Sequence, residues 1–183
     1  MTRILGLSGS LRRDSFNTAL LRAAAEVAGD GVEIDIATLH GIPLYDADLE
    51  DREGIPASVN DLRRRIAGSD GLLIATPEYN NSIPGVVKNG IDWLSRRPGE
   101  DPHVFVDLKV AIIGASPGGF GTILAQNAWL PVMRTLQVRQ WFGGRLQVSR
   151  AGKLFDEDSR LADDDVRERL KSFVDGFAGF VTD

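Results

Sequence analysis

The sequence predicts an α/β fold in which helices cover both faces of a parallel β-sheet. Three short apolar runs, at residues 4–7, 72–75 and 110–114, are continuous rather than alternating. Such runs are typical of strands that are buried on both faces. The segments between them carry apolar residues spaced three and four apart, as amphipathic helices do. Strands that alternate with helices form a parallel sheet with a helical layer on each side.

Two further strands complete the predicted sheet. Residues 32–36 alternate strictly between apolar and charged side chains, which is the pattern of a half-exposed strand at a sheet edge. Residues 138–142 form a weaker fifth candidate. Five strands of this kind fit the flavodoxin-like order 2-1-3-4-5, with the alternating strand at the edge. We expect one domain that spans residues 1–183, a length that can bury a sizeable core.

Apolar periodicity also predicts helices at residues 16–27, 59–66, 86–94, 123–136 and 166–181. Pro131 lies inside the fourth of these and predicts a kink or a break, because proline removes a backbone donor and its ring clashes with the preceding turn. Residues 39–56 are expected to form a long polar loop, and residues 153–165 an exposed acidic segment.

Composition limits the kinds of site and partner. The formal net charge of −5 argues against nucleic acid as a partner. The chain has no cysteine, which excludes disulfides, thiolate metal sites and cysteine nucleophiles. Histidines and carboxylates do not occur at metal-ligand spacing, so no metal site is expected. No apolar stretch approaches the roughly 20 residues that span a bilayer. We therefore expect a cytoplasmic protein without membrane contact.

The first candidate site is the stretch GSLRRDSFN, residues 9–17, which follows the first strand and opens the first helix. A helix N-terminus presents unpaired N–H groups and the positive end of a dipole. Ser10, Ser15 and Asn17 add hydrogen-bonding side chains, and Arg12 adds a positive charge. These groups suit a phosphate monoester. Alternatively, Ser15 or Asn17 only caps the helix and the arginines are solvated.

Two more candidate loops follow the third and fourth strands. TPEYNNSIPG, residues 76–85, is stiffened by two prolines, and its backbone groups and Tyr79 suit the edge of a flat heterocycle. SPGGFGT, residues 116–122, carries glycines that let the backbone approach a ligand and free N–H groups for an anion. Taken singly, each is also compatible with an ordinary surface turn. Because ligands bind beyond the carboxyl ends of parallel strands, we expect the three loops to meet.

Together the three loops predict a ligand with a phosphate at one end and a flat polar ring at the other. FMN fits this description better than NAD, whose phosphates lie in the middle of the molecule. The stretch 9–17 contains neither G-x-x-x-x-G-K-[ST] nor G-x-G-x-x-G, which disfavours P-loop and Rossmann dinucleotide sites.

The motifs GSLRRDSFN, TPEYNNSIPGVVKNGIDW and SPGGFGT resemble those of the NADPH-dependent FMN reductase family, which includes chromate and quinone reductases and small azoreductases. The resemblance covers nearly the whole chain, in order and spacing. It implies a flavodoxin-like fold, bound FMN, NADPH or NADH as co-substrate, and a homodimer or homotetramer. Many chromate-reductase-like members carry tyrosine where this chain has Asn81.

The resemblance also implies a set of FMN-binding residues. Those around the phosphate are Ser10, Leu11, Arg12, Ser15, Phe16 and Asn17. Those along the ring are Pro77, Glu78, Tyr79, Asn80 and Asn81. Those at the pyrimidine side of the ring are Ser116, Gly118 and Gly119.

The implied function is an FMN-dependent NAD(P)H oxidoreductase that reduces quinones or similar acceptors by two electrons in a ping-pong sequence. Chromate, azo compounds and free flavin are acceptors of the same kind. No catalytic residue is assigned, because the flavin carries the hydride chemistry and solvent can supply protons. The alternative is a flavodoxin-like electron carrier without NAD(P)H activity of its own. Arg12, Arg13 and the modest net charge favour the enzyme.

Several bulky or charged residues have two possible roles. Large apolar groups near the fourth helix and fifth strand belong either to the core or to a subunit interface, where Trp and Met are enriched. They are Trp129, Met133, Trp141 and Phe142. Arg96 and Arg97 are candidates for contact with the 2′-phosphate of NADPH. His40 and His103 lack a partner pattern and are expected to be surface or structural residues.

Overall fold

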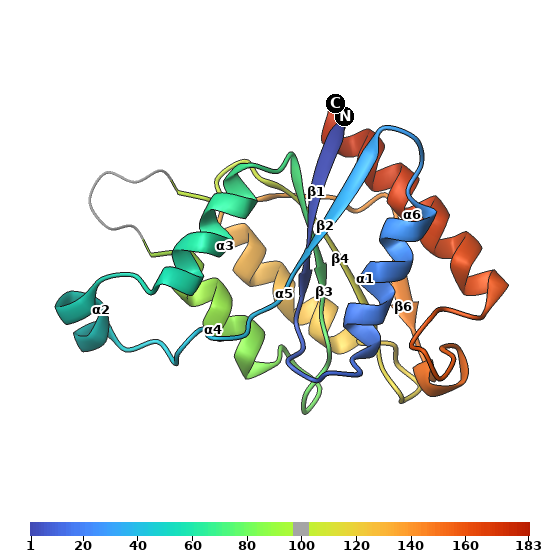
Figure 1. Cartoon of the computed structure of the whole chain (residues 1–183), viewed down its shortest axis with the longest axis horizontal. Helices are drawn as coiled ribbons and strands as arrows, with labels where there is room; N and C mark the ends of the chain where they lie inside the picture. Colours follow the sequence, from blue (N-terminus) through green and yellow to red (C-terminus); the bar gives the residue numbers. More distant parts are fainter. Residues whose placement is uncertain (97–102) are drawn as a thin grey trace.

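Parallel strands form a sheet of order β2-β1-β3-β4-β5, and a sixth strand, β6, also pairs with β4 (Figure 1). The computed structural model describes residues 1–96 and 103–183. The strands are β1 (Thr2–Ser8), β2 (Val32–Ala37), β3 (Gly71–Ala75), β4 (Lys109–Ala115), β5 (Arg139–Gln140) and β6 (Leu146–Val148). The predicted flavodoxin-like strand order is therefore confirmed.

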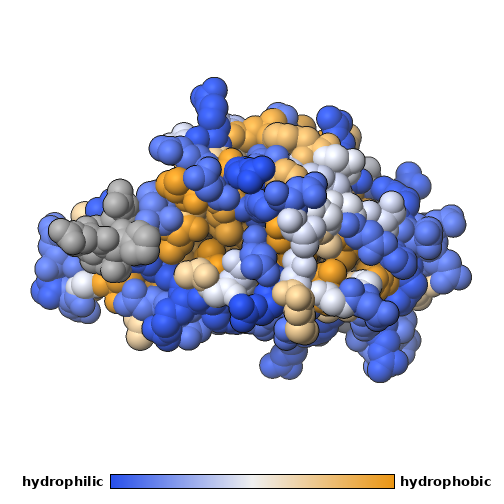
Figure 2. Space-filling view, turned by 90° about the horizontal axis from the view of Figure 1, so that it is seen from above, coloured by the Kyte–Doolittle hydropathy of each residue, from blue (hydrophilic) through white to orange (hydrophobic). Residues whose placement is uncertain are grey.

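Helices cover both faces of this sheet, as predicted (Figure 1). One layer contains α1 (Phe16–Val27) and α6 (Asp164–Thr182). The other contains α3 (Ala57–Ala67), α4 (Gly85–Leu94) and α5 (Ile123–Thr135). Both chain ends lie together at the end of the sheet where β1 begins, at the top of Figure 1. Seen from this side, the surface is mostly hydrophilic with apolar patches between the polar groups (Figure 2). No helix among the described residues is long and apolar enough to cross a bilayer.

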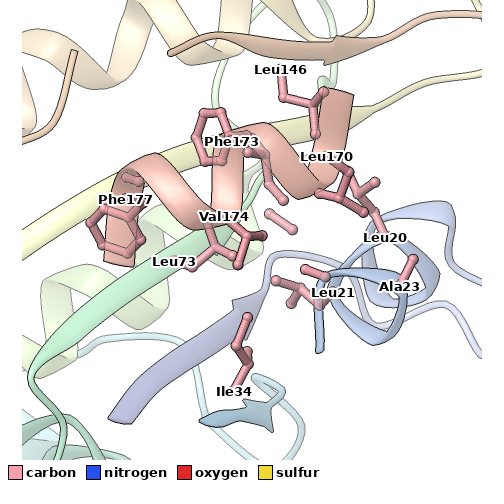
Figure 3. Packing of buried hydrophobic residues seen from close by; sticks show 14 of the residues in the cluster. Leu20, Leu21, Ala23, Ile34, Leu73, Leu146, Leu170, Phe173, Val174 and Phe177 are labelled. Atoms are coloured by element: carbon pink, nitrogen blue, oxygen red, sulfur yellow. The ribbon is translucent and has the colours of Figure 1, made fainter. Parts of the chain in front are cut away.

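Each face of the sheet carries its own hydrophobic core. Successive side chains of a strand point to opposite faces, so the continuous apolar runs fill both cores at once. In β3, Leu73 packs beneath α1 and α6, whereas Leu72 and Ile74 pack beneath the other layer. Figure 3 shows the first core, where Leu20 of α1 lies beside Leu170 of α6 and Leu73 of β3 beside Val174 of α6. Burial on both faces is the reason these strands lack alternation.

The edge strand β2 follows the predicted half-exposed pattern. Ile34 and Ala37 are buried, whereas Glu33 and Asp35 are exposed. The Asp35 carboxylate accepts from Nη2 of Arg65 in α3 at 2.7 Å, so its charge is paired with the helix that covers this face.

The segment between β2 and α3 differs from prediction, because it contains a helix, α2 (Ala47–Glu53), within the expected polar loop 39–56. Asp46 caps this helix by accepting the N–H of Asp48 at 2.9 Å. None of its residues is buried, so it has no apolar periodicity from which to predict it. The segment before this helix is held by Trp93, which donates from Nε1 to the Pro43 carbonyl at 2.9 Å.

Of the kink or break predicted at Pro131, the break does not occur, since α5 continues through it to Thr135. The carbonyl that loses its donor belongs to Asn127, which is exposed and can bond to water.

The predicted fifth strand, residues 138–142, is shorter than expected, because β5 covers only Arg139–Gln140. Only β5 pairs there, and β6, which the prediction missed, resumes the pairing with β4 after a five-residue excursion, residues 141–145. The N–H of Trp141 still donates to the Val110 carbonyl of β4 at 2.8 Å, and its ring packs on Phe173 of α6, with ring centroids 4.8 Å apart. A three-residue strand such as β6 is too short for a periodicity signal.

Candidate active site

The three candidate loops meet at the carboxyl ends of β1, β3 and β4, along the lower edge of the sheet in Figure 1. We call residues 9–15 loop 1, residues 76–84 loop 2 and residues 116–122 loop 3. Gly9 of loop 1 donates its N–H to the Ala75 carbonyl at 2.9 Å. A β-carbon at Gly9 would lie 2.8 Å from Cδ of Pro77 in loop 2. Only glycine allows the two loops to run this close together.

Loop 1 presents both a helix cap and a set of unpaired donors. The Ser15 Oγ accepts the N–H groups of Asn17 at 3.2 Å and Thr18 at 3.3 Å, so Ser15 is the cap of α1. The Ser10 Oγ accepts the N–H of Arg12 at 3.2 Å. Further backbone N–H groups donate to no other described residue, namely those of Leu11, Arg13, Asp14 and Phe16. The cap interpretation is therefore correct for Ser15, and N–H groups of the kind that can hold an anion are unpaired beside it.

The positive charge of loop 1 is also unpaired. Arg12 and Arg13 are exposed, and neither forms an ion pair with a described residue. His40, which follows β2, lies within hydrogen-bonding distance of the Leu11 carbonyl, with Nε2 3.2 Å from the oxygen. This structural contact of His40 with loop 1 could not be assigned from the sequence, because 29 residues separate the two partners.

The side chains of Asn17 and Phe16 are engaged within the protein. Asn17 is 4% exposed, donates from Nδ2 to the Ala115 carbonyl at 3.0 Å and accepts the Ala115 N–H at Oδ1 at 2.9 Å. The Phe16 ring packs on Phe155, with centroids 5.6 Å apart. Both residues hold the start of α1 in place, and the backbone N–H of Phe16 remains unpaired.

Loop 2 is a short hairpin with a fixed shape. Tyr79 and Ser82 exchange backbone hydrogen bonds of 3.2 and 3.1 Å. The two central residues, Asn80 and Asn81, have φ angles of 50° and 60°, the left-handed conformation of a type I′ turn, which Asn tolerates well. Tyr79 is 49% exposed. Pro77 is buried, and the Glu78 carboxylate accepts the N–H groups of Leu124 and Ala125 in α5.

Loop 3 offers unpaired donors next to open space. Gly118 and Gly119 are exposed, and their N–H groups donate to no described residue. No atom lies within 4 Å of a β-carbon built at either position. Two backbone hydrogen bonds hold the loop in place: the N–H of Arg150 donates to the Gly118 carbonyl at 2.8 Å, and that of Ala151 donates to the Ser116 carbonyl at 3.0 Å. The sequence did not predict this supporting role of residues 150–151.

The large apolar residues near α5 divide between core and surface. Trp129 and Met133 are buried at 0% and 1% exposure, so the core alternative is correct for both. Phe142 is 70% exposed and lines a cavity of about 350 Å³ between α5 and the β5–β6 segment. Arg96 is engaged with Glu50, Nε to Oε2, at 2.8 Å. Arg97 lies outside the described residues.

The described residues contain no group of three or more histidines and carboxylates that could hold a metal ion. His103 accepts the N–H of Phe105 at Nδ1, at 3.3 Å. The three loops therefore offer N–H donors, hydroxyls, the Asn80–Asn81 turn and an arginine.

Comparison with known proteins agrees with this chemistry. The family model described as NADPH-dependent FMN reductase matches residues 2–152. An NAD(P)H-dependent FMN reductase of Pseudomonas aeruginosa is 43% identical over 169 residues, which cover 92% of this chain and 89% of that protein. A 2-hydroxy-1,4-benzoquinone reductase of Burkholderia sp is 36% identical over 181 residues, which cover 99% and 97%.

Among solved structures, FerB of Paracoccus denitrificans, a flavoenzyme NAD(P)H:(acceptor) oxidoreductase, superposes with a TM-score of 0.87 at 30% identity. The superposition covers 100% of this chain and 98% of that one. The match in sequence and fold extends through all three loops, and the chain belongs to the NADPH-dependent FMN reductase family.

Proposed function

We propose that this chain is an FMN-dependent NAD(P)H oxidoreductase that reduces quinones and similar acceptors by two electrons. The observation that carries the proposal is the row of unpaired N–H groups in loop 1, at the N-terminus of α1 and beside the unpaired arginines. Relatives that are named FMN reductase and benzoquinone reductase support it.

The residues present fit FMN. The phosphate would lie on loop 1 and the start of α1, where the N–H groups of Leu11, Arg13 and Phe16 are unpaired. The Ser10 hydroxyl and the Arg12 guanidinium belong to the same loop. Ser15 and Asn17 would support that loop through the cap and the bonds to β4.

The ring of FMN would lie between loops 2 and 3, whose lining residues are Pro77, Glu78, Tyr79, Asn80, Asn81, Ser116, Gly118 and Gly119. When bound, FMN supplies the hydride chemistry, taking a hydride from NAD(P)H and passing two electrons to the acceptor. The free N–H groups of Gly118 and Gly119 would stabilise negative charge at the edge of the ring, as an oxyanion hole does.

The acceptor and NAD(P)H are proposed to use one site in turn, which gives ping-pong kinetics. The exposed positions of Tyr79 and of the loop 3 glycines support an open site of this kind. Such a site would also accept chromate, azo compounds and free flavin. Parallel lines in double-reciprocal plots at several acceptor concentrations would support the proposal, and intersecting lines would overturn it.

Flavin binding and nucleotide oxidation test the function directly. The purified protein, reconstituted with FMN, is expected to show a bound-flavin spectrum and to oxidise NADPH or NADH when a benzoquinone is added. Bound flavin without nucleotide oxidation would favour the electron carrier. Absence of FMN binding would overturn both the oxidoreductase and the electron-carrier hypothesis.

We further propose a homodimer or homotetramer in the cytoplasm. The support is an apolar surface in which Phe142 is 70% exposed and Ile123, Leu124 and Leu130 of α5 are each 39% to 41% exposed. Exposed apolar side chains that gather in this way favour association. Light scattering after size exclusion is expected to give a multiple of 19.9 kDa, whereas a mass of 19.9 kDa would overturn the oligomer. Cell fractionation tests the location.

A further inference from the structure

Helix α5 begins without a capping side chain of its own. Its N-cap residue, Thr122, has a φ of 67° and makes no side-chain cap bond. The Thr122 Oγ1 instead accepts from Nε2 of Gln126 at 3.1 Å. A usual N-cap residue is extended, and its side-chain oxygen accepts an N–H of the first turn. The first-turn donors of α5 therefore need an acceptor from elsewhere in the chain.

That acceptor is Glu78, which lies 46 residues before its partner Leu124. The Glu78 Oε2 accepts the N–H of Leu124 at 2.8 Å and that of Ala125 at 3.0 Å. Both bonds are charge-assisted, and the negative charge lies at the positive end of the helix dipole. Glu78 is thus bound to protein donors through the oxygen that faces α5.

The contact joins two of the three candidate loops at their rim. Glu78 belongs to loop 2, and α5 follows loop 3 without a gap. At the buried base of the same pair of elements, Trp129 donates from Nε1 to the Thr76 Oγ1 at 3.2 Å. The Trp129 contact is buried at the first residue of loop 2, whereas the Glu78 contact lies two residues further along the loop, on its more exposed side.

We infer that Glu78 is a positioning residue of the flavin site, whose carboxylate holds loops 2 and 3 at a fixed separation and offsets the positive end of α5. The inference rests on the proposed function, because it assigns Glu78 a role toward the flavin ring. It makes two predictions. Loss of the carboxylate loosens the ring side of the site and leaves loop 1 unchanged. Loss of the charge also makes the surroundings of the ring more positive.

Binding of FMN and of riboflavin to apoprotein variants tests the first prediction. In Glu78→Ala, both flavins are expected to bind about tenfold more weakly, by similar factors, because the two lost bonds concern the ring and not the phosphate. In Glu78→Gln, the loss is expected to be smaller, since the amide oxygen still accepts an N–H. If Glu78→Ala does not fold, the binding of both flavins to Glu78→Gln tests the prediction instead.

The matched control is Asp163→Ala, which removes a capping carboxylate from another helix. Asp163 accepts the N–H of Val166 at 2.9 Å at the start of α6. We expect this variant to unfold at a lower temperature and to bind both flavins as the wild type does.

The midpoint potential of the bound flavin tests the second prediction. A more positive environment favours the reduced, more negative ring, so the potential of Glu78→Gln is expected to be higher than that of the wild type. A potential that is equal or lower would overturn the electrostatic part of the inference.

Different results would overturn the proposed function and the positioning role of Glu78. If the wild type binds no FMN, the proposed function is overturned. If the wild type binds FMN and the Glu78 variants bind both flavins equally well, the positioning role of Glu78 is overturned and the proposed function stands. A loss confined to FMN would also overturn that role, because it would move the effect of Glu78 to the phosphate.

Discussion

The side-chain amide of Asn17 and the backbone of Ala115 form two hydrogen bonds, one in each direction. The Asn17 Nδ2 donates to the Ala115 carbonyl at 3.0 Å, and its Oδ1 accepts the Ala115 N–H at 2.9 Å. The amide thus pairs with β4 as a neighbouring strand would. Because Asn17 lies in the first turn of α1 and Ala115 ends β4, the pair fixes loop 1 against loop 3.

Asn17→Asp is expected to lower the free energy of unfolding by about 2–4 kcal/mol, because it places a buried oxygen without a proton opposite the Ala115 carbonyl. Chemical denaturation of the apoprotein measures the change. Asn127→Asp serves as the control, since Asn127 is exposed, and is expected to stay within about 0.5 kcal/mol of the wild type. Equal stability of the two variants would contradict the role of the Asn17 pair.

Gly9→Ala is expected to destabilise the protein by about 1–3 kcal/mol and to weaken FMN binding, because a methyl group has no room there. Its carbon would lie 2.7 Å from the Val87 Cγ2 and 2.9 Å from the Ala75 carbonyl oxygen, besides the contact with Pro77. Gly85→Ala is the matched control, since a β-carbon there meets no atom within 4 Å. Thermal unfolding of both variants checks the prediction, and a Gly9→Ala protein as stable as the control would refute it.

The hydroxyl of Tyr45 is expected to titrate above its ordinary value of 10.0, because burial and the hydrogen bond that it donates to Glu50 raise its pKa. The neutral form is favoured in the fold, so the stability that it contributes is present below pH 10 and is lost as pH rises through the folded pKa. Tyr79→Phe leaves Tyr45 as the one tyrosine of the chain, and its absorbance can then be titrated alone.

Adding Glu50→Gln to that variant removes the charged acceptor and is expected to lower the pKa of Tyr45. A midpoint at or below 10 before this second change would show that the Tyr45–Glu50 contact does not form in solution.

The fold could be predicted wherever burial leaves a periodic or continuous apolar pattern. The runs at β1, β3 and β4, the alternation of β2 and the weaker fifth strand fit the flavodoxin-like order, which the structure confirms. α2 carries no buried residue and β6 only three residues, so neither produces such a pattern. Trp141, which follows β5, packs against Phe173 of α6, a contact between residues far apart in the chain that no local pattern reveals.

The candidate site could be located from the sequence, because polar loops after neighbouring parallel strands must meet. Which of the loop side chains face a ligand and which support the loops could not be predicted from the sequence. Asn17 and Glu78 belong to motifs that resemble flavin-binding stretches, yet their side chains bind backbone groups 98 and 46 residues away. A side chain that would touch a ligand and one that supports a loop require the same polar chemistry, and only the fold distinguishes them.

The central claim is that loop 1 holds the phosphate of FMN, and Arg12 gives its most direct test. The measurement is the ratio of riboflavin to FMN dissociation constants in the wild type, in Arg12→Ala and in Arg13→Ala. We expect the wild type to bind FMN more tightly than riboflavin and Arg12→Ala to reduce that preference about tenfold, through loss of a charge-assisted contact. Arg13→Ala is expected to change it less. Equal weakening of FMN and riboflavin in Arg12→Ala, or no preference for FMN in the wild type, would contradict the claim.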